Sequence, residues 1–181
     1  KYNLPRMIWV TNMDDDNASF RQVVVDLQEL YGKKIAPLHL PIRENGQFVG
    51  YVNVIQMKAK RWKEDGTVDK TDVPDYSFEN LEICREALLE SVAETSEEYM
   101  DRYFSGDTFS ENEIRQVLHT NVCDGSMVPI SMASGTMAKG IYTLLDDIVK
   151  YLPSPEKKQC KAINIKTNEV YDADFNFAKA K

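Results

Sequence analysis

Apolar positions along the chain follow two spacings, and each spacing predicts a different element. Short apolar runs at Met7–Val10 and Met127–Met132 have the length of strands buried in a parallel sheet. Each run is followed by a polar loop and then by apolar residues at helical spacing, over Ser19–Tyr31 and Gly140–Leu152. Strands and helices that alternate in this way predict an α/β fold, with an apolar face of each helix packed on the sheet.

The middle of the chain has a different pattern. Ile35–Ile42 is predicted to be a strand, and Phe48–Met57 to be its extended partner, because Asn45-Gly46 between them is a strong hairpin signal. Lys63–Tyr76 is rich in charged residues and is predicted to be a surface loop. A helix is expected after Ser77, ending near Ala93. This region therefore predicts an α+β unit placed between the two halves of the parallel sheet.

Composition excludes some classes of function. The 181 residues carry a net charge of -7, which disfavours direct binding of DNA or RNA by phosphate neutralisation and favours a basic protein partner. The three cysteines, Cys84, Cys123 and Cys160, indicate neither a disulfide framework nor a zinc site, and they suit a reducing cytoplasm. No apolar run has the length of a membrane span, so we expect a cytoplasmic protein without a membrane partner. Because the chain leads directly into a core strand, it is expected to be a fragment.

Three consecutive carboxylates, Asp14 to Asp16, follow the first predicted strand. The carboxyl end of a buried strand is where open α/β sheets place ligand-binding residues. One interpretation is therefore a ligand loop, and the other is a solvated loop that supports the dipole of the next helix. A metal-dependent hydrolase is disfavoured, because consecutive carboxylates diverge and Ala18 departs from the calcium-loop pattern. No metal site and no catalytic residue are predicted.

The stretch Pro5–Phe20 resembles, without a gap, the guanine-specificity segment of the elongation factor G family, the translocation GTPases of protein synthesis. The family has Asn-Lys-Met-Asp where this chain has Thr11-Asn12-Met13-Asp14. The resemblance implies that Asp14 pairs with guanine, a task for which a carboxylate with two acceptor oxygens is suited. Thr11 and Asn12 depart from the family, and Asn12 lacks the lysine stem that would cover the base. A shifted register, with Asp15 as the guanine ligand, restores Asn-x-x-Asp but breaks the gapless match.

A second loop carries the same resemblance. Ala133-Ser134-Gly135 follows the last predicted core strand, where the family has Gly-Ser-Ala. In the family, the backbone amide after the serine binds the guanine oxygen, and a glycine keeps that amide. The resemblance thus adds Ser134 and Gly135 to the predicted guanine site, and the alternative is a plain turn.

The resemblance extends over essentially the whole chain, including Leu40–Trp62, Glu94–Val122 and Leu152–Pro155. It implies three parts. Residues 1–42 and 124–155 would form the carboxyl-terminal half of a phosphate-loop GTPase domain, and residues 43–123 an inserted α+β subdomain. Residues 156–181 would be a linker and the first strands of a β-barrel.

No Gly-x-x-x-x-Gly-Lys-Ser/Thr phosphate loop occurs in the chain, and the switch segments of a GTPase are also missing. We therefore expect no GTPase activity from this chain alone and no tightly bound nucleotide. GTP or GDP with magnesium would bind to the parent protein, whose activity is expected to be GTP hydrolysis.

Four acidic residues are spaced to share one face of the predicted helix after Ser77: Glu79, Glu82, Glu86 and Glu90. An ordinary solvated face is one interpretation. A docking surface is the other, because the inserted subdomain of the family contacts the ribosomal stalk protein. The resemblance implies the ribosome as the partner, with ribosomal RNA contacted only through the parent.

Two functional hypotheses remain open. The first is a fragment of an elongation factor G-like, ribosome-dependent GTPase that promotes translocation. The alternative is a protein-interaction module, or a divergent elongation-factor-like paralogue with a decayed nucleotide site.

Overall fold

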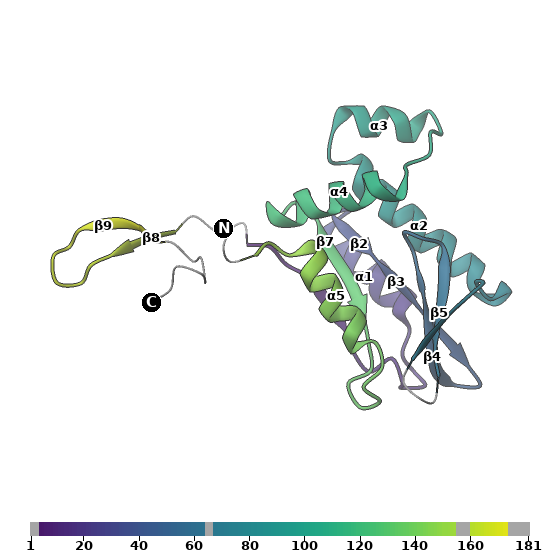
Figure 1. Ribbon diagram of the computed structural model, residues 1–181. Coiled ribbons are helices and arrows are strands. Elements are labelled where there is room, and N and C mark those ends of the chain that lie inside the picture. The colour runs from purple at the N-terminus through teal and green to yellow at the C-terminus, as the bar shows by residue number, and fades with distance from the viewer. Residues whose placement is uncertain (1–3, 64–66, 155–159, 174–181) are drawn as a thin grey trace.

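A computed structural model describes residues 4–63, 67–154 and 160–173. Strands and helices alternate at both ends of the main body, with an antiparallel sheet and three helices between them (Figure 1). The strands are β1 Ile8–Val10, β2 Ile35–Pro37, β3 His39–Glu44, β4 Gln47–Asn53, β5 Lys58–Trp62, β6 Val68–Thr71, β7 Val128–Met132, β8 Cys160–Ile163 and β9 Val170–Ala173. The helices are α1 Phe20–Tyr31, η1 Asp75–Ser77, α2 Phe78–Ala93, α3 Glu97–Phe104, α4 Glu111–Cys123 and α5 Ile141–Tyr151.

A three-stranded parallel sheet has the order β1-β7-β2, so the last core strand of the chain lies between the first two. All of β7 is buried, as the continuous apolar run predicts. Helix α5 lies in front of this sheet and α1 behind it (Figure 1). The predicted α/β fold is therefore confirmed, and β1 and β7 begin one residue later than expected.

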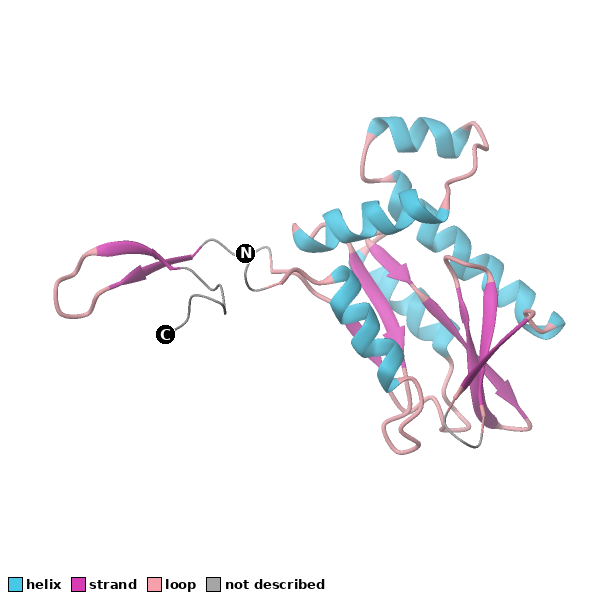
Figure 2. Cartoon of the chain, viewed as in Figure 1, coloured by secondary structure: helices cyan, strands magenta, loops and turns pink. Residues whose placement is uncertain are grey.

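A second sheet has the antiparallel order β3-β4-β5-β6 (Figure 2). The predicted hairpin at Asn45-Gly46 is confirmed, with φ of 50° and 78° at these two residues, as a two-residue turn requires. Gly50 in β4 cannot be replaced without movement, because a Cβ there would lie 2.3 Å from the Lys60 carbonyl oxygen. Both sheets share one apolar core with α2 and α4.

Two predictions for this region are wrong. Ile35–Ile42 is not one strand, because the chain leaves the parallel sheet at Leu38 and enters the antiparallel sheet. The Leu38 amide donates to Ile130 of β7, and its carbonyl accepts from Val54 beyond β4. Lys63–Tyr76 is not only a loop, since it contains β6, which pairs with β5. Three of the four residues of β6 are exposed, so this strand does not need alternating apolar residues. The sequence therefore gave no sign of it.

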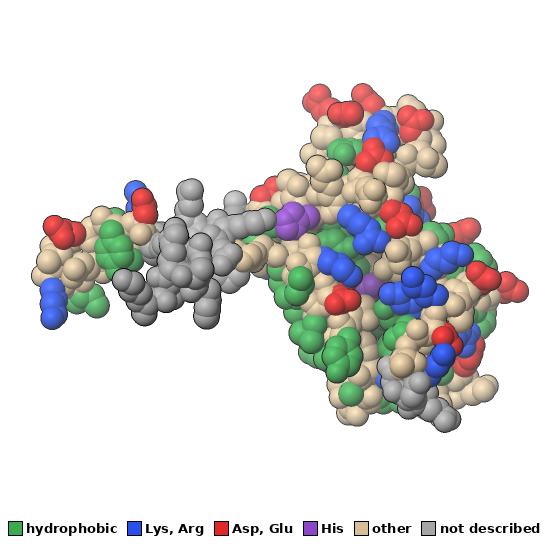
Figure 3. Space-filling view, in the orientation of Figure 1, with side chains coloured by type: hydrophobic (Ala, Val, Ile, Leu, Met, Phe, Trp, Pro, Cys, Tyr) green, Lys and Arg blue, Asp and Glu red, His purple; other side chains and the backbone are tan. Residues whose placement is uncertain are grey.

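Helix α5 differs from the expected packing. Leu145 on the predicted apolar face is 50% exposed, and Ile148 is 36% exposed. Apolar side chains of this helix form a green area at the surface in the space-filling view (Figure 3). The residues of α5 that are buried are Asp147 and Tyr151. The reason is that Asp147 has polar partners inside the core, so the helix is rotated away from the orientation that hydrophobicity alone predicts.

Strands β8 and β9 form a two-stranded antiparallel sheet within the predicted linker and barrel segment. Residues 156–159 and 174–181 of that segment lie outside the described residues. None of the described helices has both the length and the apolar character of a membrane span. The division into a GTPase part, an inserted subdomain and a barrel segment stays a prediction.

Candidate functional site

The two loops that carry the predicted guanine residues follow neighbouring parallel strands. Strand β1 leads into the loop with Asp14, and β7 leads into the loop with Ser134. Backbone hydrogen bonds continue beyond the strands, from Ala133 N to Val10 O at 2.9 Å and from Met13 N to Ala133 O at 3.4 Å. The structure therefore brings the two loops together at one end of the sheet, at the position where α/β folds bind ligands.

Asp14 is connected directly to the second loop. The Thr136 hydroxyl donates to Asp14 Oδ2 at 2.7 Å, and Ser134 Oγ lies 3.0 Å from Thr136 Oγ1. The hydroxyl groups of Ser134 and Thr136 hold the pKa of Asp14 below its ordinary value, which keeps this carboxyl ionised at neutral pH. The other oxygen, Asp14 Oδ1, is buried and has no hydrogen-bond partner among the described residues. An ionised carboxylate can accept a ligand N–H, and a ligand here has to reach Oδ2, which already accepts from Thr136, or uncover Oδ1.

The Ser134 loop is a tight turn. Ser134 pairs with Lys139 through both backbone groups, at 2.9 and 3.1 Å, and its buried hydroxyl accepts from Met137 N at 3.1 Å. Gly135 is exposed at the tip, and its amide has no acceptor in the described part of the chain. A Cβ at Gly135 would meet nothing within 4 Å, so the glycine is not sterically required there. Within the described residues, the turn therefore leaves the Gly135 amide free to donate to a ligand.

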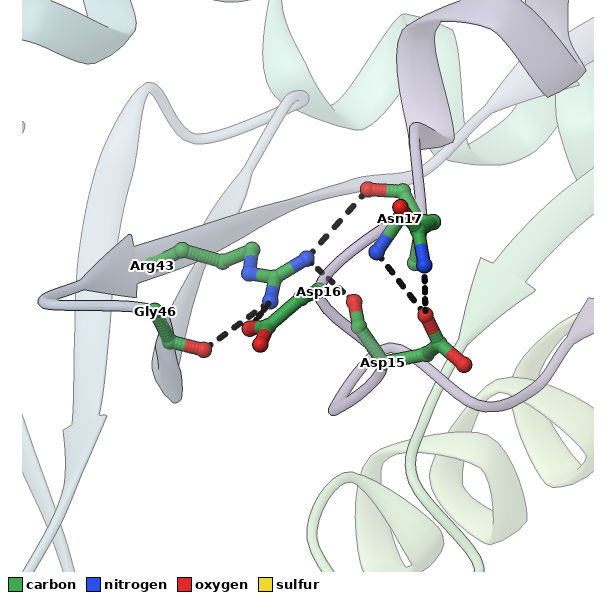
Figure 4. Close-up of polar contacts among 6 residues, drawn as sticks. Asp15, Asp16, Asn17, Arg43 and Gly46 are labelled. Carbon is green, nitrogen blue, oxygen red and sulfur yellow. Dashed lines mark hydrogen bonds and ion pairs between the residues drawn. The ribbon is translucent and has the colours of Figure 1, made fainter.

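The residues that depart from the family motif lie at the surface. Thr11 and Asn12 are exposed, and the Thr11 hydroxyl donates to Asn12 Oδ1 at 3.3 Å. Asn12 has φ of 59°, a left-handed conformation that asparagine tolerates better than most residues. Asp15 accepts from the Asn17 backbone amide at 2.8 Å and from its side chain at 3.3 Å (Figure 4). Asp15 is thus engaged within its own turn, as Asp14 is engaged with the second loop, and the choice between the two registers stays a prediction.

Arg43, which the sequence did not single out, holds the acidic loop in place. Its guanidinium donates to the carbonyls of Asp15 at 2.6 Å and Gly46 at 2.9 Å, and to Asp16 Oδ1 at 3.2 Å (Figure 4). A further contact reaches the Ala18 carbonyl at 3.3 Å. Arg43 belongs to β3, so this loop of the parallel sheet is tied to the antiparallel sheet. Thr136 was also missed, and its only sequence signal was its place two residues after Ser134.

The acidic residues of α2 are mostly exposed. Glu79, Glu82 and Glu86 lie at the surface. Glu90 is different, because its side chain is 29% exposed and its carboxylate lies 3.5 Å from Lys33 Nζ. We define the acidic ridge as Glu79, Glu82 and Glu86, with Glu90 at its half-buried end. The ridge is available to a partner, but no contact identifies one.

A second polar cluster is buried between the two sheets and α5. His39 Nε2 lies 2.8 Å from Asp147 Oδ2, and the Ser131 hydroxyl donates to the same oxygen at 2.9 Å. All three side chains are at most 4% exposed. His39 is the first residue of β3, so this strand carries a buried polar side chain into the core. Ser131 and His39 both contact Asp147 rather than each other, so this trio lacks the serine-to-histidine bond of a hydrolytic triad.

The described residues contain no group of three or more His, Cys, Asp or Glu side chains placed to hold a metal ion. Asp14, Asp15 and Asp16 diverge, because each contacts different neighbours. Their arrangement gives no support to a metal site on this loop.

Comparison with known proteins identifies relatives of the chain. No family model matches it. The elongation factor G of Thermotoga maritima and that of Thermotoga neapolitana are each 37% identical to it over 157 residues, which are 86% of this chain and 23% of the relative. A crystal structure of a protein from Thermus thermophilus has a TM-score of 0.73 and 32% identity, over 86% of this chain and 23% of that one. The predicted resemblance is confirmed, and the chain spans less than a quarter of the length of these relatives.

Proposed function

Because this chain is homologous to a segment of elongation factor G, we propose that it is the guanine-reading part of a translational GTPase that acts on the ribosome. The observation that carries the proposal is the junction of two loops, where ionised Asp14 and the Gly135 amide lie at the ends of neighbouring strands. The rest of a longer protein would supply the phosphate loop, the magnesium ion and hydrolysis. Translocation, as the step that hydrolysis drives, is part of this proposal.

The chemistry of the two loops is complementary to one base. Guanine presents a ring N–H and an amino group side by side, and an ionised carboxylate accepts both. Its neighbouring carbonyl oxygen requires a donor, which the Gly135 amide provides. Adenine has an acceptor where guanine has the ring N–H, and it would leave Asp14 without a donor. The missing lysine stem at Asn12 removes a cover for the base, so we expect weaker binding than a complete motif gives.

Exchanging the carboxylate for an amide tests this assignment. Xanthine has an oxygen where guanine has its amino group, so Asp14→Asn, which supplies a donor, should shift preference from guanosine to xanthosine. The measurement is a titration of each nucleoside followed by the amide resonances of residues 11–14 and 134–136. Asp15→Asn is the matched control and should leave the preference unchanged. If Asp15→Asn shifts the preference instead, the register is displaced by one residue, and if neither does, the guanine assignment is wrong.

A second role is supported by the acidic ridge. Three exposed carboxylates on one face of α2, in a chain of net charge -7, are complementary to a basic protein surface. We propose that this surface contacts the ribosomal stalk protein, with the protein working in the cytoplasm. This contact does not require a bound nucleotide, so it also describes the alternative in which the chain is an interaction module with a decayed guanine site.

A further inference from the structure

Lys139 joins the loop that carries Ser134 to the antiparallel sheet. Its side chain is half-buried, and Nζ donates to the Phe48 carbonyl oxygen of β4 at 3.1 Å and lies 5.9 Å from the centre of the Trp62 ring of β5. We propose that Lys139 is a positioning residue, which holds this loop so that the Gly135 amide can donate to the guanine oxygen. The inference rests on the proposed guanine site and identifies what controls one half of it.

The anchor point on the sheet is well packed. Phe48 is fully buried, and its ring packs edge-on against Trp62, with the ring centres 4.8 Å apart. The ladder between β4 and β5 begins at Gly50 and does not reach the Phe48 carbonyl, so the Lys139 ammonium supplies a donor there. Lys139 makes no ion pair with any described residue. Its ammonium is therefore committed to this carbonyl and to the Trp62 ring.

The backbone of Lys139 closes the same loop. Ser134 N donates to Lys139 O at 2.9 Å, and Lys139 N donates to Ser134 O at 3.1 Å. Gly135 follows Ser134 directly, so its amide is one peptide unit away from this pair of hydrogen bonds. One residue therefore connects the predicted guanine donor to β4, through its backbone at one end and its side chain at the other.

The loop needs an anchor because its backbone is strained. Ala138 has φ of 52°, a left-handed conformation that is unfavourable for alanine. Such a residue persists where the surrounding contacts hold it in place, and residues 135–138 are exposed and offer little packing of their own. Thr136 also ties the loop to Asp14, but at the carboxylate oxygen that a base would use. The Lys139 anchor lies away from that oxygen, so it is retained when a base binds.

The Asp14 loop has a corresponding connection. Arg43 of β3 donates to the Asp15 carbonyl at 2.6 Å and to the Gly46 carbonyl at 2.9 Å (Figure 4). The two loops are therefore tied to adjacent strands of the antiparallel sheet, β3 and β4. Base recognition at the end of the parallel sheet then depends on the position of the antiparallel sheet.

A guanine analogue with a weaker acceptor tests the role of Lys139. 6-Thioguanosine keeps the ring N–H and the amino group that face Asp14, but it presents sulfur instead of oxygen to the Gly135 amide. Both nucleosides are titrated into the 181-residue chain, and amide shifts are followed by NMR at residues 11–14 and 134–136. Lys139→Met removes the ammonium and keeps an unbranched side chain beside Trp62. We expect wild type to prefer guanosine about fivefold, and Lys139→Met to lose this preference through weaker guanosine binding, with the affinity for 6-thioguanosine changed by less than about twofold.

Two further variants control for structural effects. Lys139→Arg retains a cationic donor for the Phe48 carbonyl, so it should restore the preference for guanosine. Lys60→Met is the matched control, because Lys60 also lies over a ring of this sheet, 5.7 Å from the centre of Tyr51, and it should leave both affinities unchanged. Circular dichroism confirms that each variant folds.

The outcomes separate this role from the guanine site itself. A preference for guanosine that is unchanged in Lys139→Met, or a loss that Lys60→Met shares, would overturn the positioning role and leave the guanine site standing. Wild type that binds guanosine and adenosine equally would instead overturn the guanine site. Hydrogen exchange in the free protein then still tests the anchor, because the Ser134 and Lys139 amides should exchange faster in Lys139→Met than in wild type. Equal exchange rates would show that Lys139 does not hold the loop.

Discussion

At the residue scale, the acceptor that a guanine base would use already receives a hydrogen bond. Asp14 Oδ2 accepts from the Thr136 hydroxyl at 2.7 Å, while Oδ1 is buried and unused. A base that approaches this carboxylate has to displace the hydroxyl or share the carboxylate with it. Thr136 therefore either competes with the ligand or holds Asp14 in position for it.

We predict that Thr136 competes. Thr136→Val keeps the shape of the side chain and removes the donor, so guanosine affinity should rise about tenfold, the equivalent of about 1.4 kcal/mol. The pKa of Asp14 should rise at the same time, because one of the hydroxyl groups that lower it is lost. Nucleoside titration and a carboxyl NMR titration measure the two effects. Weaker binding in the variant would show that Thr136 positions Asp14 instead.

At the element scale, three separate elements meet at Asp147. It belongs to α5 and contacts His39 of β3 and Ser131 of β7, so one buried carboxylate ties a helix to both sheets. Tyr51 of β4 adds an edge-on ring contact to His39 at 5.0 Å, and its hydroxyl accepts from Thr143 of α5. This cluster fixes α5 although much of the apolar surface of that helix is exposed.

Removing the carboxylate should loosen this junction. Asp147→Ala leaves two buried groups without their partner, and we expect the free energy of unfolding to fall by about 3 to 5 kcal/mol. Asp146→Ala is the matched control on the same helix, since Asp146 is 72% exposed and its ion pair among the described residues is with Lys150, at 3.7 Å. Its effect should stay within about 0.5 kcal/mol. Urea unfolding measures both, and equal losses in the two variants would contradict the role given to Asp147.

The link between α3 and α4 depends on pH. Arg102 donates to Glu113, and the capping box with Ser110 adds two more bonds, which together lower the pKa of Glu113 to about 2. A carboxyl whose pKa is lowered by folding stabilises the fold above its unfolded value of 4.5, and that stability is lost as the pH falls toward 2.

Acid unfolding checks this expectation. Wild type should lose stability between about pH 4.5 and 2 more steeply than Glu113→Gln, which cannot titrate and retains the capping geometry. Glu111→Gln is the control in the same turn, because the Glu111 side chain is 50% exposed and its carboxylate lies 3.4 Å from Arg115. Identical acid slopes for wild type and Glu113→Gln would contradict the prediction.

Hydrophobic periodicity predicted elements such as β7 and α1, in which the apolar positions of the sequence are also the ones that face the core. It failed at Leu38, because an extended chain has the same alternation whichever sheet it joins. It failed at Asp147, because a carboxylate in the core depends on partners that are distant in sequence. For the site, the resemblance to elongation factor G predicted that Asp14 and Ser134 belong together, and they lie at the same end of the sheet because they follow neighbouring parallel strands. Arg43 and Thr136 were not predictable, since their contacts arise only when loops from different strands meet.

At the scale of the whole molecule, the acidic ridge should act through charge. Replacing its three exposed carboxylates by glutamine should weaken binding to purified ribosomal stalk protein and flatten the salt dependence of that binding. A triple variant of α3 with the same change in net charge, at Glu97, Glu98 and Asp101, is the matched control. Calorimetry at two salt concentrations measures both variants. Equal weakening by the two would mean that net charge alone, rather than the ridge, determines the contact.

The chain spans 23% of the length of its relatives and contains no phosphate-loop motif. These two facts predict how it binds a nucleotide that carries phosphates. With base contacts but no phosphate cradle at the site, guanosine and GDP should bind this chain with affinities within about twofold of each other. GTP should not be hydrolysed. Amide shifts at residues 11–14 and 134–136, followed by NMR as guanosine or GDP is added, measure both affinities at the Asp14 end of the sheet. A strong preference for GDP at these residues would show that this end of the sheet holds phosphate as well as base.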